Sequence, residues 1–248
     1  MILSRISRAV REQNWFAVAI EFVIVILGVV IGFQISAWAS ERQAAAAREA
    51  TLDRLHDEAE QAVVYHRDFV EMHQRFNAER TEAIERLIAN DWADADVEAM
   101  TEGITSIGIL PASNPPRTVY DELVSTGQFA EIGSPALRNA ISNYYSRLTF
   151  LQGQIEYMRS VSVDPVDWQR DDVTVTYAPG TTRERRYELD LVSLSNDPDF
   201  IEGMLVGNNT QRALTGWTES TLHAAQEMCD AIAEVTERPC VTEGEEAE

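Results

Sequence analysis

Hydrophobic and polar positions divide the chain into one unbroken apolar run and several amphipathic segments. The run lies between Trp15 and Trp38, and no residue in 22–40 carries a charge. Such a run can bury its side chains in lipid and satisfy its backbone only as a helix, whose length here is roughly 34 Å. A tryptophan at each end suits the two membrane interfaces. The pattern therefore predicts one transmembrane helix over 15–39.

A cleaved export signal is the competing interpretation of the same run. Three arginines in 1–14 form a basic segment before it, and Ala37-Trp38-Ala39 has the small-x-small form of a cleavage site. The run is longer than the ~7–15 apolar residues of a usual export signal, and Trp38 suits an interface anchor. We therefore predict an uncleaved signal-anchor and a single-pass membrane protein.

The charges beside the run nearly balance, so they do not fix its orientation. Three arginines precede it, and Arg42, Arg48 and Arg54 follow it. A short arginine-bearing tail is hard to export, whereas large acidic domains cross a membrane with little regard to charge. We therefore predict a cytoplasmic tail over 1–14 and a domain over 40–240 outside the cytoplasm. In a bacterium, this places the anchor in the inner membrane and the domain in the periplasm.

A long amphipathic helix is predicted directly after the run, over 40–90. Its apolar residues recur at steps of three and four, which is typical of a helix that packs along a coiled-coil seam. The seam consists of Leu52, Leu55, Ala59, Ala62, Phe69, Phe76, Ala83 and Leu87. No helix-breaking residue separates the run from this segment, so we expect one continuous helix.

Two histidines, His66 and His73, lie on the same seam one heptad apart. They are weak candidates for a metal site or a pH sensor. Neither has another histidine at the i+4 spacing that chelation favours. The favoured interpretation is that both are seam residues with satisfied polar edges, and we predict no metal and no cofactor.

The rest of the chain contains further helices and one hairpin. Short helices are expected near 97–107 and 119–125, the second capped by Thr118, and a long helix over 134–160 begins at Ser134. A short helix after Asp197-Pro198 and a long one over 209–237 follow. Alternating apolar residues and Pro179-Gly180 predict a β-hairpin over 172–191.

These elements define the expected fold. It is mainly α, with one N-terminal transmembrane helix continuing into an antiparallel helical bundle that carries a small β-hairpin. The hairpin is either a surface insertion or an exposed edge for a partner strand. An acidic disordered tail is expected over 241–248.

The charge and the cysteines narrow the setting of the domain. A net charge of −21 excludes nucleic acid as a natural partner. Cys229 lies in the last helix, and Cys240 follows Pro239, which ends it. A returning chain brings the two thiols nearly within bonding range, so a disulfide is expected if the domain is exported. Both thiols would stay reduced in the cytosol.

The predicted span offers a contact face for another helix. Gly28 and Gly32 form a Gly-x-x-x-Gly pair, and Glu21 lies on nearly the same face. Small residues at this spacing let two helices approach closely, and a carboxyl group in lipid requires a partner. We predict a second transmembrane helix, either another copy or a partner subunit, besides the lipid bilayer. Alternatively, the glycine pair is a chance pattern and Glu21 reaches the interface.

Two stretches of the sequence carry a resemblance to known proteins. They are the anchor Glu21–Trp38, with its Leu-Gly-Val-Val-Ile-Gly-Phe-Gln segment, and the block Thr118–Tyr145. Both resemble a family of bacterial single-span, membrane-anchored proteins of unknown function. The resemblance implies a single span with an exported helical domain. It implies no activity.

No catalytic signature accompanies these features. The sequence contains no nucleophile elbow, phosphate-cradling glycine loop, zinc-type Cys/His spacing or dinucleotide fingerprint. We therefore predict a non-enzymatic protein that binds other proteins or acts as an accessory or scaffold subunit of an envelope complex. A periplasmic ligand-binding module that signals through a partner membrane protein is the alternative, and an unrecognised hydrolase is a third.

Overall fold

The computed structural model describes residues 15–92, 96–161, 168–180 and 184–240. The predicted tails, 1–14 and 241–248, lie outside the described residues. The chain divides into two compact units, Met1–Thr51 and Leu52–Glu248.

Helix α2 (Trp15–Ala89) extends over 75 residues and contributes to both units. It contains no proline, and the prediction of a continuous helix is confirmed. The helix ends at Ala89, and the next residue, Asn90, adopts the left-handed backbone conformation with φ of 53°. The N–H of Asp91 then donates to the carbonyl of Arg86 at 3.0 Å, as in a Schellman ending.

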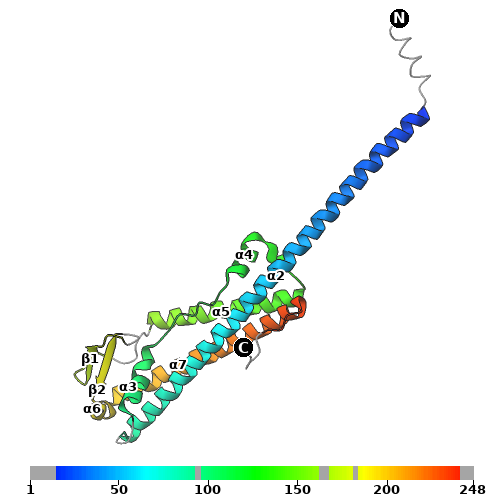
Figure 1. Ribbon diagram of the computed structural model, residues 1–248. Helices are drawn as coiled ribbons and strands as arrows, with labels where there is room; N and C mark the ends of the chain where they lie inside the picture. The colour runs from blue at the N-terminus through cyan, green and yellow to red at the C-terminus, as the bar shows by residue number, and fades with distance from the viewer. Residues whose placement is uncertain (1–14, 93–95, 162–167, 181–183, 241–248) are drawn as a thin grey trace. The chain divides into compact units, whose positions relative to one another are not determined.

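The second unit is mainly helical and carries one two-stranded antiparallel hairpin, as predicted (Figure 1). After α2 its elements are α3 (Val97–Thr105), η1 (Ser106–Gly108), α4 (Thr118–Thr126), η2 (Gln128–Glu131), α5 (Pro135–Val161), β1 (Val173–Tyr177), β2 (Arg185–Leu189), α6 (Leu191–Ser195) and α7 (Pro198–Thr236). Helices α5 and α7 pack along each other and along the part of α2 that belongs to this unit.

The predicted apolar faces form the core of the second unit. Most of the α2 seam is buried, while Leu52 and Phe76 are half-buried. The apolar face of α5 is also buried and consists of Leu137, Ile141, Tyr144, Tyr145, Leu148, Leu151, Ile155 and Met158. One cluster joins α2, α4, α5 and the end of α7, and another joins the end of α2 to α3, the hairpin, α6 and the start of α7.

Helix α3 approaches the backbone of α2 closely at Gly103. A Cβ atom at this position would lie 2.6 Å from the carbonyl oxygen of Glu79, which is closer than real Cβ contacts. The absence of a side chain at residue 103 is therefore required for α3 to pack against α2.

One correction concerns the last helices, because α7 is a single helix of 39 residues. The sequence led us to expect a short helix, a break and a new start near Asn209. The glycines and asparagines near this point lower helix propensity by only about 1 kcal/mol each. Tertiary contacts outweigh that loss: Phe200 and Met204 are buried, and Asn208 bonds the Thr81 hydroxyl at 3.4 Å.

A second correction concerns the start of α4, which Thr118 does not cap. Thr118 is itself the first helical residue, and the preceding Arg117 forms no side-chain capping bond. The carboxylate of Glu58, on α2, instead accepts the N–H groups of Val119 at 2.7 Å and Tyr120 at 3.1 Å. A buried acid from another helix thus satisfies donors that a local cap ordinarily satisfies.

The hairpin has the register expected from its alternation. Val173 pairs with Leu189, Val175 with Tyr187, and Tyr177 with Arg185. Val173 is buried against the second cluster, whereas Val175 and Tyr177 are exposed. The hairpin is thus fixed to the bundle at its base.

The structure joins Cys229 of α7 to Cys240 in a disulfide, with the two Cα atoms 5.7 Å apart. Both cysteines are buried in the first cluster. The left-handed backbone of Glu237, with φ of 57°, turns the chain back at the end of α7 and permits this closure.

Replacing Glu58 should destabilise the second unit. Glu58 is buried and also accepts the Tyr145 hydroxyl at 2.8 Å, so Glu58→Ala removes three hydrogen bonds. We expect Glu58→Ala to lower the free energy of unfolding of the second unit by roughly 3 kcal/mol, and Glu58→Gln to have a smaller effect. Urea unfolding of the full chain in mild detergent measures this. Exposed Glu71→Ala is the control, and an equal loss in both alanine variants would contradict the capping role.

Candidate functional site

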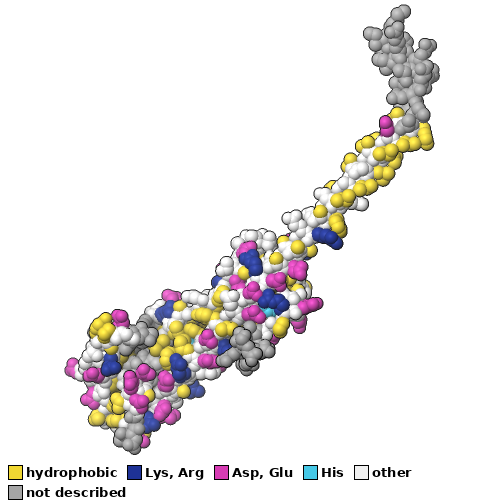
Figure 2. Space-filling model, viewed as in Figure 1, with side chains coloured by type: hydrophobic (Ala, Val, Ile, Leu, Met, Phe, Trp, Pro, Cys, Tyr) yellow, Lys and Arg dark blue, Asp and Glu magenta, His cyan; other side chains and the backbone are white. Residues whose placement is uncertain are grey.

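The N-terminal part of α2 is an uncovered apolar surface in the first unit. An 18-residue stretch of α2 has a mean hydropathy of 2.6, and none of it is buried. Side chains as large as Phe22 and Phe33 are 66% and 75% exposed. Figure 2 shows hydrophobic side chains along this part of the helix. A helix of this length and composition is typical of a membrane anchor or an export signal.

Polar and aromatic groups mark the C-terminal end of this apolar run. The guanidinium of Arg42 stacks over the indole ring of Trp38 at 4.1 Å from the ring centre. Such a pair suits a membrane interface, where an amphipathic ring lies beside a hydrated cation.

Glu21, Gly28 and Gly32, the predicted helix contacts, are exposed. A Cβ added to Gly28 or Gly32 would meet no atom within 4 Å. Packing within the chain therefore does not require either glycine. Both positions remain open to the close approach of another helix.

The predicted histidines lie inside the second unit, where His66 is fully buried and His73 is 2% exposed. His66 Nε2 lies 3.2 Å from the Tyr144 hydroxyl, and its ring packs edge-on against the ring of Tyr144. His73 packs edge-on against Phe69, with the ring centres 4.7 Å apart. Both histidines are therefore seam residues with aromatic neighbours, as expected. The expectation that their polar edges are satisfied is wrong, because His66 Nδ1 and His73 Nε2 are buried and have no hydrogen-bond partner among the described residues.

Burial keeps both imidazoles neutral at physiological pH. It lowers the pKa of His66 from 6.5 to about 4, and burial with the nearby Arg80 charge lowers the pKa of His73 to about 4. The described residues hold no group of three His, Cys, Asp or Glu side chains suited to a metal ion.

Arg80 is a buried cation one heptad after His73, and the sequence analysis missed it. It is 1% exposed, and burial lowers its pKa to about 10. Its partners are all neutral: the Ser106 hydroxyl at 3.2 Å, Asn77 Oδ1 at 2.8 Å and Asn208 Oδ1 at 3.4 Å. The heptad spacing of 66, 73 and 80 on one seam was the signal that could have located it.

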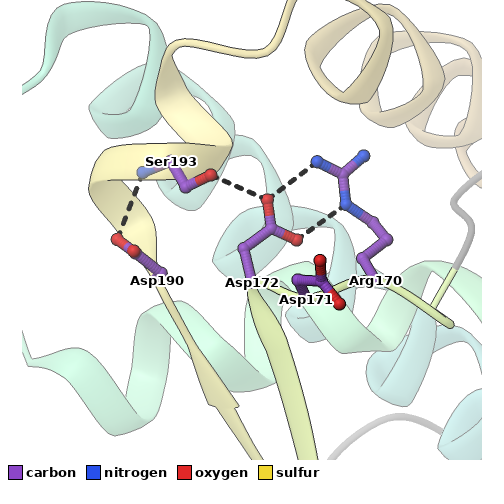
Figure 3. Close-up of a pocket in the computed structure, with 5 residues that line it drawn as sticks. All are labelled: Arg170, Asp171, Asp172, Asp190 and Ser193. Atoms are coloured by element: carbon purple, nitrogen blue, oxygen red, sulfur yellow. Dashed lines mark hydrogen bonds and ion pairs between the residues drawn. The ribbon is translucent and has the colours of Figure 1, made fainter.

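An acidic hollow lies beside the hairpin, lined by Arg170, Asp171, Asp172, Asp190 and Ser193 (Figure 3). Arg170 binds both oxygens of Asp172 at 2.8 Å, and the Ser193 hydroxyl donates to the same carboxylate at 2.9 Å. The hydrogen bonds from Arg170 lower the pKa of Asp172 to about 2. Asp172 is therefore a fixed anion rather than a proton donor.

Two further acids near this hollow, Asp190 and Asp197, are used in local structure. Asp190 caps α6 by accepting the N–H groups of Val192 and Ser193, each at 3.1 Å. Asp197 caps α7 and also binds Arg170. The cluster ties the base of the hairpin to two helix starts.

Family models, curated proteins and solved structures were each compared with the chain, and none matches.

Acidification should destabilise the second unit through two of its buried histidines, His66 and His73. The unfolded chain binds protons below pH 6.5, whereas the folded rings resist protonation until about pH 4. Stability is therefore constant above the unfolded pKa and falls as the pH decreases through this window. We expect a loss of about 2 kcal/mol for each ring between roughly pH 7.5 and pH 5.

Urea unfolding at both pH values measures this loss, with His73→Leu as the test variant. This substitution replaces one titrating ring with an apolar side chain. The difference in the free energy of unfolding between the two pH values should therefore shrink. His223→Leu is the control, since His223 is 74% exposed on its side chain. An unchanged pH dependence in His73→Leu would contradict the assignment.

Proposed function

We propose that this chain is a non-enzymatic, single-pass protein of the bacterial inner membrane. In this proposal, 1–14 lies in the cytoplasm, 15–39 spans the bilayer and 40–240 forms a periplasmic helical domain. That domain binds other proteins as an accessory or scaffold subunit of an envelope complex. The observation that carries the proposal is the apolar stretch of α2, whose mean hydropathy is 2.6 and which no described residue buries.

The disulfide supports an exported domain. Disulfides persist in oxidising compartments such as the periplasm, and the described chain has no free cysteine. The resemblance of Glu21–Trp38 and Thr118–Tyr145 to bacterial single-span proteins is consistent with the same placement. It carries no information on an activity.

The use of the polar groups supports a binding role rather than catalysis. Asp190 and Asp197 cap helices, Asp172 and Asp197 pair with Arg170, and Glu58 caps α4. His66 and His73 contact aromatic rings. Catalysis requires titratable groups that converge on a reacting atom, and these groups are instead committed to the fold.

The topology predicts where an introduced thiol reacts. Val192 on α6 is 60% exposed. In spheroplasts, Val192→Cys should react with a membrane-impermeant maleimide without lysis, because the domain faces outward. In cells that express the unsubstituted protein and are quenched with acid and denatured, a thiol reagent should label Cys229 and Cys240 only after reduction. Labelling of Val192→Cys that requires lysis would reverse the orientation.

The contact face of the span predicts which substitutions weaken helix association. Gly28→Leu and Gly32→Leu place bulk where a second transmembrane helix approaches, and each should weaken association by about 1–2 kcal/mol. Val29→Leu places the same leucine side chain on another face of the helix and is the control. A membrane reporter of span association measures the effect. Equal signals from Gly28→Leu and Val29→Leu would mean that the segment is only a tether.

A further inference from the structure

Strand β1 has one edge that faces away from β2. The N–H of Asp190 donates to the Asp172 carbonyl, and that of Ala178 donates to the Glu184 carbonyl, both at 3.0 Å. In an antiparallel pair, hydrogen-bonded positions alternate with positions whose backbone groups point outward. The backbone groups of Val173, Val175 and Tyr177 therefore point away from β2.

This outward edge is open at two of its three residues. Val173 donates its N–H to the Arg170 carbonyl at 3.3 Å. No described residue supplies a partner for the N–H of Val175 or Tyr177. Val175 and Tyr177 are also 48% and 73% exposed on the apolar side of the hairpin. β2, in contrast, contacts α3.

The edge lacks the features that ordinarily prevent pairing with another chain. Edge strands are commonly protected by a charged residue, a proline or a bulge. The strand Val-Thr-Val-Thr-Tyr contains no charge and no proline, and its register with β2 is regular. Valine, threonine and tyrosine are strong strand formers.

We propose that β1 pairs with β1 of a second copy of this chain, antiparallel and centred on Val175. The two hairpins then form one four-stranded sheet in the order β2-β1-β1-β2 around a two-fold axis. This inference goes beyond the proposed function and does not depend on it, because the strand belongs to the second unit. A chain without a membrane anchor would pair in the same way.

The sequence of the strand is complementary to itself in this register. Val175 lies opposite Val175 of the second copy, and the two residues exchange both backbone hydrogen bonds. Tyr177 lies opposite Val173 of the second copy, donates its N–H to the carbonyl of that valine, and packs as an aromatic residue against a β-branched one. Thr174 lies opposite Thr176 of the second copy on the other face. A two-fold interface requires this self-complementarity.

The distribution of charge favours contact between two copies at β1 over contact at other parts of the surface. Each chain carries a net charge of −21, so acidic surfaces of two copies repel. β1 is uncharged, and β2 has two arginines against one glutamate. On the polar face, Arg186 and Thr176 are in one row with Thr174 and Glu188 of the second copy. Each such row ends in opposite charges.

A disulfide across the two-fold axis tests the pairing. In a hydrogen-bonded antiparallel pair, the Cα atoms lie about 5.5 Å apart, which suits a disulfide. The native cysteines are already joined, so Val175→Cys introduces the only free thiol among the described residues. In membranes under mild oxidation, the full-length variant should form at least about tenfold more covalent dimer than Val192→Cys, because pairing raises the local thiol concentration.

The register is tested with two further variants. Thr174→Cys alone should not crosslink, because its counterpart in the second copy is displaced by two residues, about 8 Å away. Co-expressed Thr174→Cys and Thr176→Cys chains should crosslink to each other, since these positions are opposite. This pair also retains Val175 if the first variant folds poorly.

Three outcomes would overturn the proposal. They are dimer from Val175→Cys no greater than from Val192→Cys, equal crosslinking of Thr174→Cys alone, and crosslinking of Val175→Cys to a different protein. The last would assign the edge to another occupant. None of them bears on the membrane anchor, which the labelling of Val192→Cys tests separately.

Discussion

The burial of polar side chains along α2 is the constraint on which the second unit depends. His66, His73 and Arg80 recur at heptad spacing on a seam that is otherwise apolar, and all three are buried. An unpaired buried cation is strongly unfavourable. Asn208 of α7 therefore supplies an acceptor to Arg80, and the Tyr144 hydroxyl of α5 forms a hydrogen bond with the neutral ring of His66. Sliding one helix by a turn would remove these partners, so the polar seam sets the register of the bundle.

Helix periodicity was sufficient to predict the elements that bury one continuous face. The seam of α2 and the face of α5 follow steps of three and four, and the hairpin follows alternation. Local patterns of this kind depend only on neighbouring residues in the chain.

The features that escaped prediction depend on residues distant in the sequence. Glu58 caps a helix that begins 60 residues later, and Arg80 finds neutral acceptors on η1 and α7. The continuity of α7 across its glycines and asparagines rests on packing against α2 and α3. Among the candidate site residues, sequence reasoning identified the seam histidines and the cysteine pair. It did not reveal the acids that cap α6 and α7 while holding Arg170.

Polar groups of the second unit stabilise the fold, whereas two surfaces of the chain remain available for association. In the second unit, Glu58, Asp190 and Asp197 cap helices, and neutral acceptors hold Arg80. A few buried polar atoms, such as His73 Nε2, have no partner among the described residues. The apolar segment of α2 in the first unit and the outward edge of β1 in the second are the surfaces that the chain itself does not satisfy. An uncovered apolar helix requires lipid or another helix, and an unpaired strand edge readily accepts another strand. Both needs are met by association, which is the role we propose.

Native mass spectrometry of the full chain, released from its own membrane in mild detergent, tests this role most directly. A subunit that acts by association should emerge at fixed integer stoichiometry, with a second copy or with a particular membrane protein, and without a bound metabolite. A monomer carrying a small organic molecule would contradict the account and favour a ligand-binding module.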